Sequence, residues 1–123
     1  MTEQVMVPSE KTFLTASEIL EAQDAQSIDV LIPEWGDKYV RLRSLSAEEA
    51  LSFVAAIKDG KRDESSIRIV ALTAVNENNE RLFTEEHIQL LKTKNFRAIL
   101  RLQEAAMNLN GLTAWAAYIA KNA

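Results

Sequence analysis

Two short segments in the first third of the chain alternate between apolar and polar residues. Residues 27–32 and 38–44 place an apolar side chain at every second position, the pattern of a strand with one buried face. The inward positions are Ile28, Val30, Ile32, Val40 and Leu42. Between the segments, Pro33 can end the first strand and Gly36 can take a positive φ. The pattern predicts one antiparallel hairpin with Trp35 in its turn.

After the hairpin the apolar residues recur every three or four positions, which predicts helices. We expect helices over residues 47–60, 63–75, 84–91, 96–109 and 113–121, and a short one over residues 16–22 before the hairpin. Thr15 with Glu18 and Ser46 with Glu49 have the spacing of capping boxes. Residues 63–75 are apolar nearly all round and could form a buried strand, but their length and a cap at Asp63 favour a helix.

The helices in this prediction have defined apolar faces. The apolar face of the helix over residues 47–60 consists of Ala47, Ala50, Leu51, Val54 and Ile57. The apolar face of the helix over residues 96–109 consists of Phe96, Ile99, Leu100, Leu102, Ala106 and Met107. The second set covers a wide arc, so this helix should be central, with Gly111 as its left-handed cap.

Together these elements predict an α+β fold, in which a small antiparallel β-hairpin near the N-terminus packs against a bundle of four to five helices. The first residues contain Pro8 and no periodic pattern. We therefore expect residues 1–13 to be a flexible N-terminal arm and residues 14–123 to be a single α+β domain.

Composition narrows the classes of function. The 123 residues include no cysteine and carry a net charge of -4, so thiolate metal sites are excluded and binding to a phosphate backbone is disfavoured. No stretch is as long and apolar as a membrane span requires. We expect no nucleic-acid partner and no membrane partner.

The sequence offers little catalytic chemistry. The three glycines are far apart, which excludes a phosphate-binding glycine loop. His87 is the only histidine, and it sits in the first turn of a predicted helix beside Glu85 and Glu86. The acid pair there and the pair Glu48 and Glu49 both suit the positive end of a helix dipole. We predict no enzyme activity, no catalytic residue, no cofactor and no metal.

A few residues are candidates for contact with a partner. Trp35 lies in the hairpin turn, where it either folds back onto the core or meets another molecule. Trp115 and Tyr118 lie on different faces of the last predicted helix, and Arg97 and Arg101 share a face of the long helix with Lys94. Such a basic face is usually only the solvated side of a helix. If it binds a partner, we expect an acidic protein rather than DNA.

Five runs of residues, in their order along the chain, carry a resemblance to a known protein family. They are Glu18-Ile19-Leu20-Glu21-Ala22-Gln23-Asp24, Ile32-Pro33-Glu34-Trp35-Gly36, the run from Val40 to Glu49, Asn79-Glu80-Arg81-Leu82-Phe83-Thr84, and Leu109-Asn110-Gly111-Leu112-Thr113. In this order they resemble the tail assembly chaperones of long-tailed, siphophage-type bacteriophages. The likeness covers residues 14–115, and the alanine-rich run at 114–118 departs from the acidic ending expected in that family.

The resemblance implies a chaperone that binds the tape measure protein and keeps it soluble until tail tube subunits polymerise around it. It also implies action in the cytoplasm of the infected bacterial host and absence from the mature virion. Other partners that it suggests are the tail tube protein, a frameshift-extended form of the chain and further copies in a homo-oligomer. Two alternatives remain open: a structural tail or connector subunit, and a small regulatory nucleic-acid-binding module that uses Lys94, Arg97 and Arg101.

Overall fold

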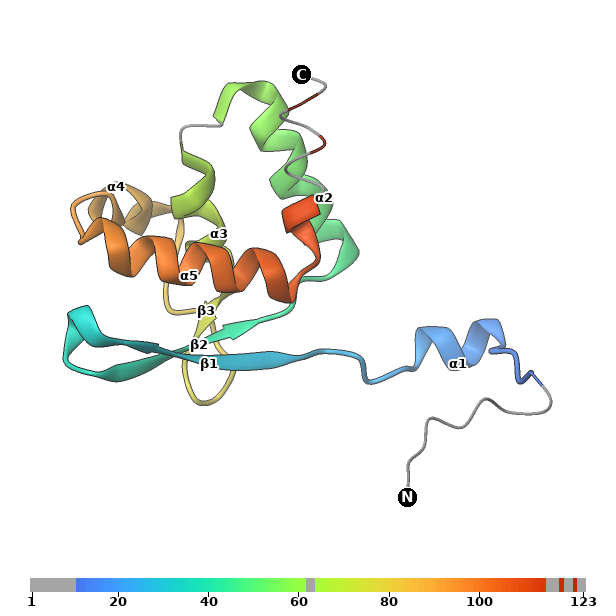
Figure 1. Ribbon diagram of the computed structural model, residues 1–123. Helices are drawn as coiled ribbons and strands as arrows, with labels where there is room; N and C mark the ends of the chain where they lie inside the picture. Colours follow the sequence, from blue (N-terminus) through green and yellow to red (C-terminus); the bar gives the residue numbers. More distant parts are fainter. Residues whose placement is uncertain (1–10, 62–63, 115–117, 119–120, 122–123) are drawn as a thin grey trace.

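The computed structural model describes residues 11–61, 64–114, 118 and 121. A three-stranded antiparallel sheet lies against a group of helices, with one further short helix set apart near the amino end (Figure 1). The predicted α+β class is confirmed.

The predicted hairpin is present, and its register is regular. Strand β1 (Ser27–Ile32) pairs with β2 (Lys38–Arg43), with Val30 opposite Val40. The turn begins with the 3₁₀ helix η1 (Pro33–Trp35) and then reverses through Gly36 at φ 85°. A left-handed residue is needed there to bring the chain back into β2, which is why glycine suits the position.

A third strand, β3 (Ala74–Val75), was missed by the sequence prediction. The helix expected over residues 63–75 exists as α3 (Ser65–Thr73), but it stops before Ala74, whose backbone is extended. Ala74 and Val75 then pair with β2 and are almost completely buried. The pairing partner lies more than thirty residues earlier, so periodicity alone could not separate these two residues from the helix. The proposed cap residue Asp63 lies outside the described residues.

The remaining helices begin where local capping signals predict. Helix α2 (Ala47–Ala56) starts with the Ser46 and Glu49 capping box and continues into a π-type turn, η2 (Ile57–Lys61). The 3₁₀ helix η4 (Glu85–His87) leads into α4 (Ile88–Leu91). Helix α5 (Phe96–Leu109) follows the N-cap Asn95, and Gly111 at φ 66° ends it as predicted.

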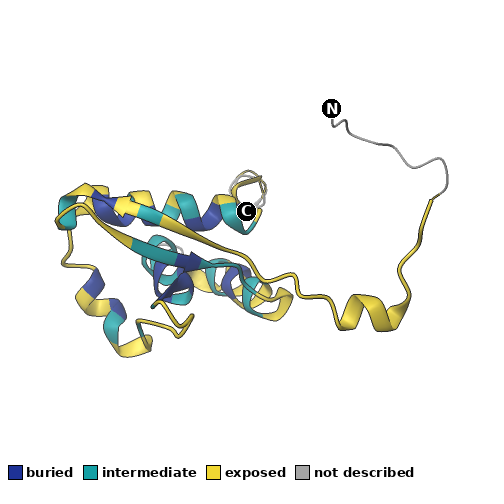
Figure 2. Ribbon diagram, turned by 90° about the horizontal axis from the view of Figure 1, so that it is seen from below, coloured by how far each residue is buried: buried dark blue, intermediate teal, exposed yellow. Residues whose placement is uncertain are grey.

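Helix α5 is the centre of the core. It packs against α3 and across the hairpin strands, so its buried residues touch both layers (Figure 1). The main cluster of buried side chains draws on every layer of the domain (Figure 2). Its members are Ile32, Leu42, Phe53, Val54, Ile69, Val70, Ala74, Ala98, Leu102, Ala106, Met107 and Leu112.

Four positions predicted to face the core are exposed instead. Ile28 is 37% exposed, Leu51 65% and Phe96 72%, and Ala47 at the start of α2 is exposed as well. The buried face of α2 instead runs through Phe53 and Val54, because α2 is covered on the side that faces α3 and the core. Phe96 is the first residue of α5, and burial on that helix begins only at Ala98.

The segment before β1 extends away from the rest of the fold (Figure 1). Helix α1 (Ala16–Leu20) has the predicted Thr15 and Glu18 capping box, yet it has no buried residue. We call residues 11–26 the α1 arm. The division of the chain at residue 13 stays a prediction, since most of the first thirteen residues lie outside the described residues.

Candidate functional site

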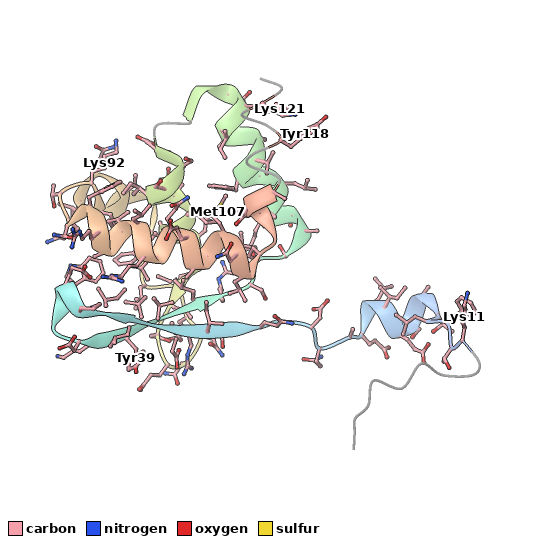
Figure 3. All side chains as sticks on the ribbon, viewed as in Figure 1. Lys11, Tyr39, Lys92, Met107, Tyr118 and Lys121 are labelled. Carbon is pink, nitrogen blue, oxygen red and sulfur yellow. The ribbon has the colours of Figure 1, made fainter. Side chains whose placement is uncertain are left out.

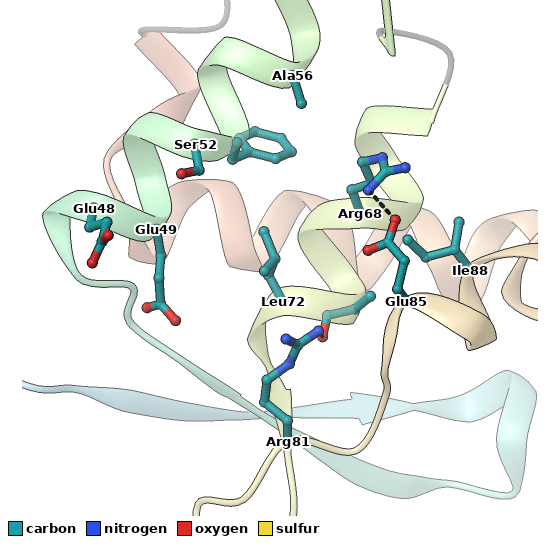
Figure 4. A pocket seen from close by; sticks show the side chains of 11 residues that line it. Glu48, Glu49, Ser52, Ala56, Arg68, Leu72, Arg81, Glu85 and Ile88 are labelled. Carbon is teal, nitrogen blue, oxygen red and sulfur yellow. Dashed lines mark hydrogen bonds and ion pairs between the residues drawn. The ribbon is translucent and has the colours of Figure 1, made fainter.

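A groove opens between α2, α3 and the segment around η4, with a cavity of about 330 Å³ (Figure 4). We call it the α2–α3 groove. Its lining residues are Glu48, Glu49, Ser52, Phe53, Ala56, Arg68, Ala71, Leu72, Arg81, Glu85 and Ile88. The groove thus combines an apolar floor with charged walls, the composition of a site for an amphipathic ligand.

The floor of the groove is lined by apolar residues from three helices. They are Phe53 of α2 and Ile88 at the start of α4, each 4% exposed, and Leu72 of α3. Leu72 is only partly buried, so part of this apolar surface remains open to a ligand. An apolar side chain of a ligand that fills this site would remove its own surface and that of the groove floor from water, which favours binding.

One wall is held in place by a chain of ion pairs. Arg68 of α3 contacts Glu64 at 2.9 Å and Glu85 at 2.9 Å, and Lys92 contacts Glu64 at 2.8 Å. The hydrogen bonds from Lys92 and Arg68 lower the pKa of the Glu64 carboxyl. The network links α3 to η4 and to the end of α4, so this wall is preorganised.

The opposite wall is formed by the first turns of α2. Glu49 accepts two hydrogen bonds from the Arg43 guanidinium, both at 3.0 Å, and also caps the Ser46 backbone at 3.0 Å. The bidentate contact with Arg43 lowers the pKa of Glu49 to about 2. The Arg43 Nε atom is buried and has no partner among the described residues. Glu49 therefore stays ionised, and its charge is largely matched by Arg43.

Arg81 is the one cation lining the groove that has no ion pair among the described residues; of the acidic lining residues, Glu48 has none either. The Arg81 Nη2 atom donates to the Ala71 carbonyl at 3.0 Å, and within the described part of the chain no carboxylate lies within ion-pair distance of Arg81. Figure 4 shows its guanidinium beside Leu72 and between the two walls. The groove thus offers one unmatched positive charge next to its apolar floor.

Comparison with known proteins gives one informative result. No family model and no curated protein matches the chain. Among solved structures, the chain is similar to one described as the tail assembly chaperone of bacteriophage HK97, with a TM-score of 0.59 and 18% sequence identity over 76% of this chain and 90% of that chain. The chain has the fold of a phage tail assembly chaperone. The resemblance that the ordered motifs predicted is confirmed at the level of the fold.

The predicted partner-contact residues do not gather in the groove of this chaperone-like fold. Trp35 is half-buried and packs against the main core, so it folds back rather than standing free. Arg101 contacts Glu34 of the hairpin turn at 3.1 Å, while Arg97 is exposed nearby. Tyr118 is 58% exposed, and Trp115 lies outside the described residues.

The basic face predicted on α5 is partly neutralised. Arg101 is paired with Glu34, and on the sheet Arg41 pairs with Asp29 at 2.8 Å. Among the described residues, each of these guanidiniums thus faces a carboxylate rather than solvent alone. This arrangement gives no support to a phosphate-binding surface.

His87 lies in the first turn of the helical segment that begins with η4, as predicted, and there it makes two contacts that the sequence did not indicate. Its Nδ1 atom accepts a hydrogen bond from the Thr84 backbone N–H at 2.9 Å, which caps η4. Its ring meets the Phe83 ring edge-on, with 5.8 Å between the ring centroids.

No helix in the described part of the chain is long and apolar enough to cross a membrane.

The groove itself was not predicted from the sequence. Its residues come from four separate elements, and several had been assigned only to helix caps. The one local signal was the spacing of Glu64 and Arg68, which form an i to i+4 ion pair.

Proposed function

We propose that the chain is a phage tail assembly chaperone that binds the tape measure protein and keeps it soluble until tail tube subunits polymerise around it. The observation that carries the proposal is the shared fold, which spans 90% of the HK97 chaperone chain. The ordered sequence motifs support it independently. On this proposal the chain acts in the host cytoplasm, without catalysis, and is absent from the mature virion.

The α2–α3 groove suits a helical client. An amphipathic helix can place one or two apolar side chains against Phe53 and Leu72 while its polar side stays in water. The walls are held by the ion pairs of Arg43 with Glu49 and of Arg68 with Glu85. Binding would therefore need little rearrangement of the chaperone.

A single shallow groove should bind weakly, which fits the proposed role. A chaperone that tail tube subunits displace must release each contact readily. Many copies that also contact one another along one long client would still hold it, because each bound copy raises the effective concentration of its neighbours at their own sites.

The test is co-expression with the tape measure protein of the same phage, which the proposal expects to be a long, helical protein encoded downstream of this chain. We expect that protein to remain in the soluble fraction and to co-purify with this chain. The variant Ser52→Trp should abolish the effect, because it places a large ring in the mouth of the groove. Ala55→Trp is the matched control, since Ala55 is exposed on the same helix but does not line the groove.

Two results would refute the proposal. One is a long protein that stays insoluble and never co-purifies. The other is detection of this chain in purified virions by mass spectrometry at the level of a structural protein, which would favour the tail or connector subunit instead.

A further inference from the structure

The α1 arm exposes more apolar surface than a short solvated segment needs. Phe13 is 79% exposed, Leu14 70%, Ile19 56% and Leu20 85%. Ala16, Ile19 and Leu20 share one face of α1 because they are three and four residues apart. The arm therefore has the apolar stripe of a helix that packs against something, although its side chains stand apart from those of the rest of the fold (Figure 3).

The helix is also too short to be stable alone. Isolated helices shorter than about 12 residues are marginal in water, and α1 has five. Its capping box, in which Thr15 N donates to Glu18 Oε1 at 2.8 Å, favours the helical form without supplying packing. A docking surface would supply the missing stabilisation.

The arm is anchored beside the α2–α3 groove. Gln26 donates to Ser44 Oγ at 2.8 Å and accepts from Ser44 N at 2.8 Å, and Ser44 lies two residues before the N-cap of α2. The six steps from Leu20 to Gln26 can span about 20 Å. From the anchor, the two steps from Ser44 to Ser46 add at most about 7 Å, and the six steps from Ser46 to Ser52 rise only about 9 Å along α2. Leu20 can therefore reach the middle of the groove of its own chain.

The groove and the arm also match chemically. The open apolar floor at Phe53 and Leu72 suits Ile19 and Leu20. Glu21 follows Leu20 directly, and Arg81 is the lining cation that has no carboxylate partner in the described part of the chain. A docked arm would place an acidic residue at the end of its apolar stripe near that cation.

We propose that α1 folds back into the α2–α3 groove of its own chain and that this docked arm competes with the client helix. The competition rests on the proposed function, whereas the docking does not. The arm covers the groove while no client is present, which limits exposed apolar surface, and a client must displace it.

Docking can be tested with a disulfide, because the chain contains no cysteine of its own. The pair Leu20→Cys with Ser52→Cys should close quickly into a monomeric, internally linked chain when oxidised at low micromolar concentration. The matched pair Leu20→Cys with Ala55→Cys, on the same helix outside the groove, should close about tenfold more slowly, because tethering alone does not hold the thiols together.

A third variant separates docking from chance collision. Adding Ile19→Asp to the Leu20→Cys and Ser52→Cys pair should slow closure to the rate of the control pair. Equal rates for all three variants would overturn the docking, and so would disulfides found only between two chains.

The competition has its own readout. Ile19→Asp in the otherwise unchanged chain should bind the downstream long protein several-fold more tightly than the original chain, and an unchanged affinity would overturn the competition. Rapid closure of the cysteine pair without any binding of that protein would refute the proposed function and leave the docking intact. Binding of that protein without rapid closure of the cysteine pair would refute the docking and leave the proposed function intact.

Discussion

Glu34 in the hairpin turn and Arg101 on α5 form an ion pair across 67 residues of sequence. The Arg101 Nε atom lies 3.1 Å from Glu34 Oε1, and Nη2 lies 3.2 Å from Oε2. The hydrogen bond from Arg101 lowers the pKa of the Glu34 carboxyl. The pair ties η1 to the central helix, and the neighbouring Trp35 packs against the core beneath it.

Arg101→Gln should loosen the hairpin turn and expose Trp35. In a Trp115→Phe background, Trp35 is the only tryptophan, so its fluorescence should shift to longer wavelength and be quenched more readily by acrylamide. Arg97→Gln is the control, because Arg97 lies nearby without an ion pair within 4 Å among the described residues. An identical spectrum for both variants would mean that apolar packing alone holds the turn.

Local signals in the sequence predicted much of this fold. The two-residue period gave both strands of the hairpin, and cap residues such as Thr15 and Ser46 marked the starts of helices to within a residue. Gly111 marked the end of α5 correctly. These features depend on neighbours within about four positions, which a sequence displays directly.

The errors and omissions all depend on distant contacts. β3 forms because β2 is available as a partner, Phe96 is exposed because no described part of the chain covers it at the first turn of α5, and the groove needs four elements together. Some motif residues also have roles that only the fold reveals. Asn110 accepts from the Leu45 backbone at 2.6 Å and donates to the Ala106 carbonyl at 3.0 Å, which joins the end of α5 to the start of α2.

Acid should destabilise the fold partly through Glu49. Its pKa is about 2 in the folded chain against an ordinary value of 4.5, so its contribution is complete above about pH 4.5 and is lost as the pH falls towards 2. Because the Glu49 side chain is 36% exposed, solvent screening reduces this contribution to about 1 kcal/mol.

Urea unfolding at pH 7 and pH 3 tests this pH dependence. Glu49→Gln should lose less stability between the two pH values than the unchanged chain does, by about 0.6 kcal/mol, because a carboxyl with a folded pKa of about 2 has lost only part of its contribution at pH 3. Glu48→Gln serves as the control because Glu48 has no ion pair among the described residues. Equal pH dependence in all three chains would contradict the assignment to Glu49.

Leu102→Ala and Phe96→Ala should differ sharply, although both residues belong to the arc predicted to be buried. Leu102 is 1% exposed and in the main core, so its truncation should cost about 3 kcal/mol of unfolding free energy. Phe96 is 72% exposed, and its truncation should change stability by less than about 0.5 kcal/mol. Chemical denaturation measures both, and a large loss for Phe96→Ala would mean that a partner or second copy covers that residue in solution.

Gly111→Ala isolates the cost of the left-handed backbone after α5. Gly111 has φ 66°, and a Cβ atom added there would meet nothing within 4 Å, so no steric clash contributes. Alanine should therefore cost about 1 kcal/mol through conformation alone. Asparagine, which tolerates this region, should cost less. Thermal unfolding of Gly111→Ala and Gly111→Asn checks the ranking. If both variants were equally destabilised, another property of glycine would be responsible. If neither were, the turn would have moved to a different conformation, which would shift the buried Leu112 that follows it.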